Sequence, residues 1–179
     1  DYLTKKEKQS DLSSQKNKEI INNLSQKIID LGGKPSLDNE NQKNLIKDLT
    51  KQLEVLSVEN VLKDKSKNII KDQTINGTKL RLQKVIDLPP KDLRKLVDSG
   101  KKEIGEGVVV VCTIKEGKIG LAVGVTNKLV KKYNAVEIVK AASIEVGGKG
   151  GGGRTDFAQA GGDDSSKVDD AFEKIKTLI

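Results

Sequence analysis

Apolar residues recur at spacings of three and four in the first part of the chain, a pattern typical of helices that bury one face. One such seam ends just before Gly32, and a second follows Pro35. The seam residues are Ile21, Leu24, Ile28 and Leu31, then Ile46, Leu49, Leu53 and Leu56. Because glycine ends helices and proline redirects the chain, we predict two antiparallel helices joined by a short loop. Such short seams predict a marginally stable pair that needs a further packing partner.

This helical pair has two interpretations. It is a coiled-coil-like spacer arm, or a dimerisation device whose seams pack against a second copy of the chain. A third, less regular helical stretch at residues 58–72 is consistent with a continuation of the second helix. Asn76-Gly77 is a turn dipeptide at the start of a strand pattern. We therefore place a helical subdomain at residues 1–75 and a globular subdomain at residues 76–179.

Strand patterns dominate the start of the second part. Apolar positions alternate along residues 78–88, which predicts a half-buried strand. The uninterrupted apolar run at residues 108–114 predicts a central strand that is covered on both faces. A return strand at residues 118–126 has one face made only of Gly120, Ala122 and Gly124. Since so little side chain lets a helix approach closely, we expect the helix predicted at residues 135–146 to pack there.

Helix signals fall between and after these strands. Pro89-Pro90 breaks the first strand and suits the first turn of a helix, and an amphipathic helix closes the chain from Val168. The predicted order is strand, helix, strand, strand, helix, glycine-rich loop, short strand and helix. The predicted fold class is α+β, with an N-terminal helical hairpin or coiled-coil arm followed by a mixed sheet with packed helices.

The amino-acid composition excludes several kinds of catalytic and metal site. The 179 residues include no His and a single cysteine, Cys112, so a His-based triad and a structural zinc site are excluded. Cys112 lies inside the apolar strand run and is interpreted as a buried, inert thiol. One cysteine fits a reducing compartment, so we expect a cytoplasmic protein. No apolar run reaches the roughly 18 residues of a membrane span, and the start at Asp1 predicts a fragment of a longer chain.

The charge balance is basic. Lys and Arg total 33 against 26 Asp and Glu, a net charge of +7 and a sequence pI near 9.3. A basic balance suits an anionic partner such as nucleic acid, although a lysine-rich solvated surface gives the same numbers.

Residues 147–162 are the most informative stretch, with eight of the 17 glycines of the chain. Gly148-x-Gly150-x-x-Gly153 matches a dinucleotide fingerprint, but the context is wrong because that motif follows a strand. A backbone without side chains can approach a partner closely, and flanking cations suit phosphates. The candidate nucleic-acid-binding residues are Lys149, Gly150, Gly151, Gly152, Gly153, Arg154 and Gln159. The alternative is a flexible surface loop with solvated charges.

The stretch GGKGGGGRTDFAQAGG resembles the signature GGKGGGRPDMAQAGG near the C-terminus of bacterial alanyl-tRNA synthetases. The similarity extends back to about residue 75, whereas residues 1–74 match only in helical character. This chain has one extra glycine, Thr155 where proline is usual and Phe157 where methionine is usual. DHH-type phosphoesterases carry the same type of domain with a His in the motif. Arg154 stands near that position here, which favours the synthetase branch.

The resemblance implies a C-terminal tRNA-binding domain that contacts the elbow of the tRNA for alanine and links aminoacylation with editing. It implies that ATP and a zinc ion serve the upstream catalytic and editing domains of the same chain. For this segment it implies no cofactor, no metal, no catalytic residue and no membrane contact. The helical part mediates dimerisation in some members, so a homodimer is a possible partner. The alternative function is a dimerisation or structural module without direct RNA contact.

Overall fold

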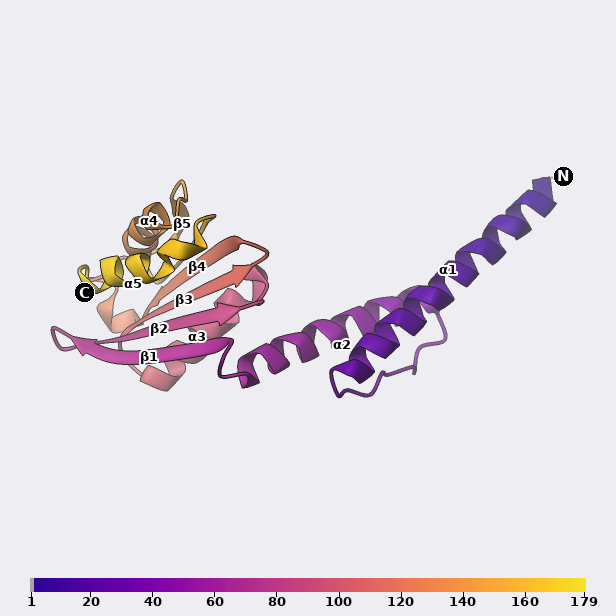
Figure 1. Ribbon diagram of the computed structural model, residues 1–179, viewed down its shortest axis with the longest axis horizontal. Helices are drawn as coiled ribbons and strands as arrows, with labels where there is room; N and C mark the ends of the chain where they lie inside the picture. The colour runs from indigo at the N-terminus through magenta and orange to yellow at the C-terminus, as the bar shows by residue number, and fades with distance from the viewer. Residues whose placement is uncertain (1) are drawn as a thin grey trace. The chain divides into compact units, whose positions relative to one another are not determined.

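The computed structural model describes residues 2–179, and the chain divides into two compact units between Asn60 and Val61. The first unit contains two long helices and the second contains a sheet with its own helices (Figure 1). The predicted α+β fold class is confirmed. The predicted division at residue 75 lies too late, because residues 68–75 pair with the next strand instead of ending the helical part. Within the described residues no helix is long and apolar enough to cross a membrane.

Helices α1 (Tyr2–Asp30) and α2 (Gln42–Lys63) pack through the apolar seams that the sequence predicts. The buried residues are Ile28, Leu45 and Leu49, with Ile21, Leu24, Leu53 and Leu56 partly buried around them. Leu45 thus takes the core position predicted for Ile46, which is only half-buried, and Leu31 is also half-buried. The seam lies one residue off the predicted position at the start of α2.

The two helices run in the same direction, so the predicted antiparallel arrangement is wrong. At the start of α2, Gln42 accepts a hydrogen bond from the Asn17 amide of α1 at 3.3 Å. Near the other end, the Asn60 amide donates to the carbonyl oxygen of Leu31 at 3.1 Å. Both contacts join positions in ascending order along the two helices, which requires a parallel pair (Figure 1).

The linker at residues 31–41 makes this direction possible. It runs back alongside α2, and the Gln52 side chain holds it by donating to the Lys34 carbonyl at 2.7 Å and accepting from the Ser36 amide at 3.1 Å. The Asn41 side chain then accepts from the amide of Lys43 at 3.0 Å and caps α2. The second helix therefore begins at Gln42, later than Pro35 alone suggests.

The second unit is built on a six-stranded sheet with the order β1-β2-β3-β4-β6-β5. The strands are β1 (Asn68–Ile75), β2 (Thr78–Ile86), β3 (Val108–Lys115), β4 (Lys118–Val125), β5 (Gly151–Arg154) and β6 (Phe157–Gly162). Only the β2–β3 pair is parallel among these strands, and helix α3 (Leu93–Ile104) makes its crossover. Helices α4 (Ala135–Glu145) and α5 (Val168–Lys176) complete the unit. The predicted central strand is confirmed, since β3 is buried from Val108 to Thr113.

The two faces of the sheet carry different helices (Figure 1). Helices α4 and α5 cover the face with the large side chains of β4, such as Leu121 and Val123. The glycine face of β4 lies against α3, because a Cβ built on Gly124 would meet Val97 Cγ1 at 2.2 Å. The expectation that the helix at residues 135–146 packs on the glycine face is therefore wrong. Close approach occurs as predicted, but the helix that uses it is α3.

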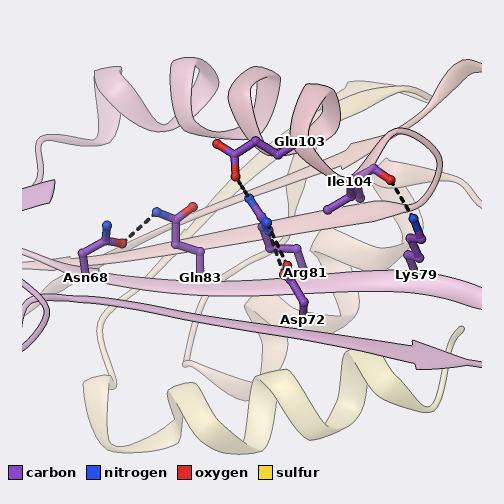
Figure 2. A network of polar contacts seen from close by, with 7 residues as sticks. All are labelled: Asn68, Asp72, Lys79, Arg81, Gln83, Glu103 and Ile104. Carbon is purple, nitrogen blue, oxygen red and sulfur yellow. Dashed lines mark hydrogen bonds and ion pairs between the residues drawn. The ribbon is translucent and has the colours of Figure 1, made fainter.

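A polar network fixes α3 over the first two strands (Figure 2). The buried Arg81 guanidinium on β2 donates to both carboxylate oxygens of Asp72 on β1, at 2.7 and 2.8 Å, and also to Glu103 on α3. The hydrogen bonds that Arg81 donates to Asp72 and then to Glu103 hold its pKa above the usual value. A charged bidentate pair is strong and directional, so it sets the position of the helix end.

We predict that Gly124→Ala destabilises the second unit, because the new methyl group overlaps Val97 and pushes α3 from the sheet. The expected loss in the free energy of unfolding is about 1–3 kcal/mol, measured by urea denaturation. Gly161→Ala is the matched control, since its Cβ would meet its nearest atom at an ordinary 3.4 Å. An equal loss in both variants would contradict the close packing of α3.

Candidate nucleic-acid interface

The predicted glycine-rich loop is partly a strand. Residues 151–154 form β5, which pairs antiparallel with β6 through the turn Thr155-Asp156 and lies at the edge of the sheet. We call residues 151–162 the glycine hairpin. Sequence reasoning missed β5 because a run of glycines carries no pattern of apolar and polar positions. Its partner strand β6, rather than its own side chains, gives β5 its extended conformation.

Several glycines of this region are required by the fold. A Cβ on Gly148 would come within 2.0 Å of the Gly161 carbonyl oxygen and 2.1 Å of Ser143 Oγ. Gly153 has φ +149°, and a Cβ there would meet the Phe157 carbonyl oxygen at 2.4 Å. These glycines let β5 lie against β6 and α4, so packing alone explains them.

Gly152 is different. It is exposed, its φ lies outside the left-handed region, and a Cβ on it would find nothing within 4 Å. The fold therefore has open space for a side chain at this position. Gly152 stands opposite Gln159 and bonds to it in the ladder, so the N–H and C=O groups that face away from the sheet are those of its neighbours Gly151 and Gly153. The missing side chain of Gly152 leaves this edge of the backbone uncovered.

The hairpin is held in place at both ends. At its base the buried Ser143 hydroxyl of α4 donates to the Gly161 carbonyl at 2.8 Å. At its tip the Thr155 carbonyl accepts from the Ala135 amide at 2.9 Å, and the Asp156 carbonyl accepts from the Val125 amide at 2.9 Å. A partner therefore meets a surface that is already ordered, which lowers the entropy lost on binding.

Cations gather around the tip of the hairpin. Arg154 keeps 69% of its side chain exposed, with Nε 3.4 Å from Asp156 Oδ1. Lys101 of α3 donates to the Asp156 carbonyl at 3.2 Å. Arg94 of α3 lies 4.7 Å above the centroid of the Phe157 ring. Arg94 and Lys101 were not predicted; their signal is a spacing of seven, which places both on one flank of the helix.

The other predicted binding residues do not all lie on the same surface as Arg154. Gln159 is exposed and directly opposite Gly152, so the two share a face of the hairpin with Arg154. Gly150 and Gly151 are half-buried at the entry to β5. Lys149 is exposed before the strand, and its ammonium makes no hydrogen bond or ion pair with the described residues. The structure thus joins Gly152, Arg154 and Gln159 on one surface and leaves Lys149 beside it.

Cys112 lies away from this surface. It is fully buried in β3, and burial raises the pKa of its thiol to about 12. A thiol with such a pKa is protonated at neutral pH, in agreement with the prediction of an inert cysteine. Across residues 2–179, no group of three or more His, Cys, Asp or Glu side chains is arranged to hold a metal ion.

The fold and this surface define an α+β domain with a glycine-rich, cation-flanked hairpin at the sheet edge. The family model described as "DHHA1 domain" matches residues 77–179, and the chain belongs to this family. It is 51% identical over 108 residues to an alanine–tRNA ligase of Parvibaculum lavamentivorans, and 49% over 106 residues to one of Rhodopseudomonas palustris. These matches cover 60% and 59% of this chain, but only 12% of each ligase.

Among solved structures, the chain is similar to the C-Ala domain of Aquifex aeolicus alanyl-tRNA synthetase. The TM-score is 0.57 with 30% sequence identity, over 60% of this chain and 96% of that domain. The resemblance to the C-terminal domain of alanyl-tRNA synthetases, stated above from the glycine-rich motif, is confirmed.

Proposed function

We propose that this chain is the tRNA-binding C-terminal domain of an alanyl-tRNA synthetase, and that the glycine hairpin contacts the RNA. The exposed edge around Gly152 beside Arg154 carries the proposal, because it offers the outward-facing N–H groups of Gly151 and Gly153 and a cation on one ordered surface. The relatives' names and the net charge of +7 support an RNA partner. Arg154 can pair with a phosphate or stack on a base, and Gln159 adds an amide beside it.

The proposal extends to the role of the domain in the longer protein. The bound tRNA is the one for alanine, the contact is at its elbow, and the domain helps aminoacylation and editing act on one tRNA. ATP and zinc then belong to the catalytic and editing domains upstream, in the cytoplasm, and this segment contributes binding without catalysis. The absence of His from the chain and the inert Cys112 support that division of roles.

We predict that Arg154→Ala and Lys149→Ala each weaken binding of a tRNA transcript for alanine by about two- to fivefold. For each phosphate that the variant no longer neutralises, the slope of log affinity against log salt becomes shallower by about one. Filter binding over a salt series measures both quantities. Arg154→Lys keeps the charge and is expected to keep the slope, so it separates charge from stacking.

Lys174→Ala is the matched control, because Lys174 is an exposed lysine on α5, the helix on the opposite face of the sheet from α3. Unchanged affinity and slope in both Arg154→Ala and Lys149→Ala would refute the proposed contact. A hydroxyl-radical footprint of the complex tests the elbow. Protection at the elbow supports the proposal, and protection confined to the acceptor end contradicts it.

We predict that Gly152→Val weakens tRNA binding without changing the salt slope. The side chain has open space in the free protein, so folding is retained, but it stands where the RNA would approach the backbone. Thr74→Val on β1 places the same side chain on the other edge strand and is expected to bind normally. Wild-type affinity of Gly152→Val would show that the backbone at this position does not touch RNA.

A dimerisation module is the second candidate, and exposed apolar side chains on the helical pair favour it. Leu12, Ile20, Ile29 and Val55 each keep 45–55% of their surface exposed. If these residues join two copies, sedimentation equilibrium gives a mass that rises toward that of a dimer with concentration, and Ile29→Lys with Val55→Lys restores the monomer. A monomer at every concentration would remove this candidate and leave the RNA-binding proposal intact.

A further inference from the structure

An open groove of about 780 Å³ lies at the C-terminal end of α3. Its charged lining residues are Lys79, Asp98, Lys101, Lys102, Glu106 and Lys128. Four lysines therefore face two carboxylates. They come from three places in the fold, namely the start of β2, the last turns of α3, and the turn at Asn127–Leu129 after β4.

The carboxylates of the groove already have cationic partners. Glu106 lies 3.2 Å from the ammonium of Lys128, and Asp98 lies 4.0 Å from Arg94. Lys79 donates to the Ile104 carbonyl at 3.2 Å and so caps the C-terminal end of α3 (Figure 2). The exposed Lys102 makes no hydrogen bond or ion pair with any described residue. The groove thus holds an excess of positive charge, because among its lysines only Lys128 is in a carboxylate ion pair, and Lys102 has no polar partner among the described residues.

Lys101 connects this groove to the glycine hairpin. Its stem crosses β4 at Gly124, where a Cβ would meet its Cδ and Cε at 3.3 Å. Its ammonium reaches the Asp156 carbonyl, and the carboxylate of the same Asp156 faces Arg154 at 3.4 Å. One residue of the turn between β5 and β6 therefore contacts a cation of the groove and a cation of the hairpin, so the two positive regions are continuous.

Compensation of the helix dipole explains part of this arrangement, since lysines in a last turn favour the negative end of a helix. It does not explain Lys128, which comes from a separate turn, or Lys101, which points to Asp156 instead of to the helix carbonyls. Of the described residues that line the groove, none is aromatic. The groove therefore lacks a surface for base stacking, and its chemistry suits phosphates.

We propose that the α3 groove is a second subsite for the phosphate backbone of the RNA that the glycine hairpin contacts. The backbone passes from Arg154 across Lys101 to Lys102, and Lys128 exchanges its ion pair with Glu106 for a phosphate. This inference rests on the proposed function and adds to it the path that the RNA backbone follows along the domain surface. Phosphate contacts of this kind position the RNA without reading its sequence.

The test compares Lys102→Ala, Lys102→Arg and Lys174→Ala in the 179-residue chain, with the tRNA transcript for alanine as the probe. Alanine is a good helix former, so Lys102→Ala is expected to fold, which a thermal melt checks. We expect Lys102→Ala to bind about two- to fivefold more weakly, with a salt slope shallower by about one. Lys102→Arg keeps the charge, so it and Lys174→Ala are expected to bind like the wild type.

The double variant Lys102→Ala with Arg154→Ala shows whether one RNA touches both regions. Independent contacts to the same RNA add in free energy, so the two fold-changes in affinity multiply. The slope of log affinity against log salt is then shallower by about two. If Arg154→Ala weakens binding and Lys102→Ala does not, the groove proposal is wrong and the hairpin contact stands. If neither variant changes affinity or slope, the proposed function fails and the groove proposal fails with it.

Discussion

The close approach of α3 to the glycine face of β4 is the constraint on which the rest of the second unit depends. Gly124 leaves the space that Val97 and the stem of Lys101 occupy. Because the helix lies so near the sheet, the ammonium of Lys101 reaches the Asp156 carbonyl, and Arg94 reaches the Phe157 ring. A larger residue at position 124 would separate the helix from the hairpin turn and would disperse the cations that now surround it.

A different interaction fixes the last turn of α3 over the first two strands. Arg81 joins Asp72 on β1 to Glu103 on α3, so the edge strand, its neighbour and the helix are linked through one side chain. A guanidinium that is 10% exposed loses hydration, and the two carboxylates replace that hydration with charged hydrogen bonds. The polar network therefore holds the groove at the end of α3 in shape, although none of its three members is proposed to touch RNA.

Side-chain pattern predicted the elements that have their own periodicity. The run at Val108–Ile114, the return strand that follows it and the apolar seams of α1 and α2 all appear near their predicted positions. Pattern gave no information on the direction of α2, because that depends on the path of the linker and on the hydrogen bonds of Gln52. It also gave none on β5, whose glycines take their conformation from β6.

The candidate site, like the fold, was predictable only in part from the sequence. The glycine-rich motif located the surface but did not separate Gly153, which packing requires, from Gly152, which packing does not require. Nor did it find Lys101, which becomes a neighbour of Asp156 only through the packing of α3 over Gly124.

The position of the hairpin at a sheet edge also bears on the kind of partner it accepts. An exposed edge strand ordinarily invites another strand, and short length, glycine and charge all discourage that pairing. β5 has all three features, with four residues of which three are glycine and the fourth is Arg154. The backbone is thus uncovered, yet the strand offers no apolar side chains to a protein strand. A polyanion needs no such side chains, because its phosphates bind N–H groups and cations directly, and the hairpin is suited to that partner.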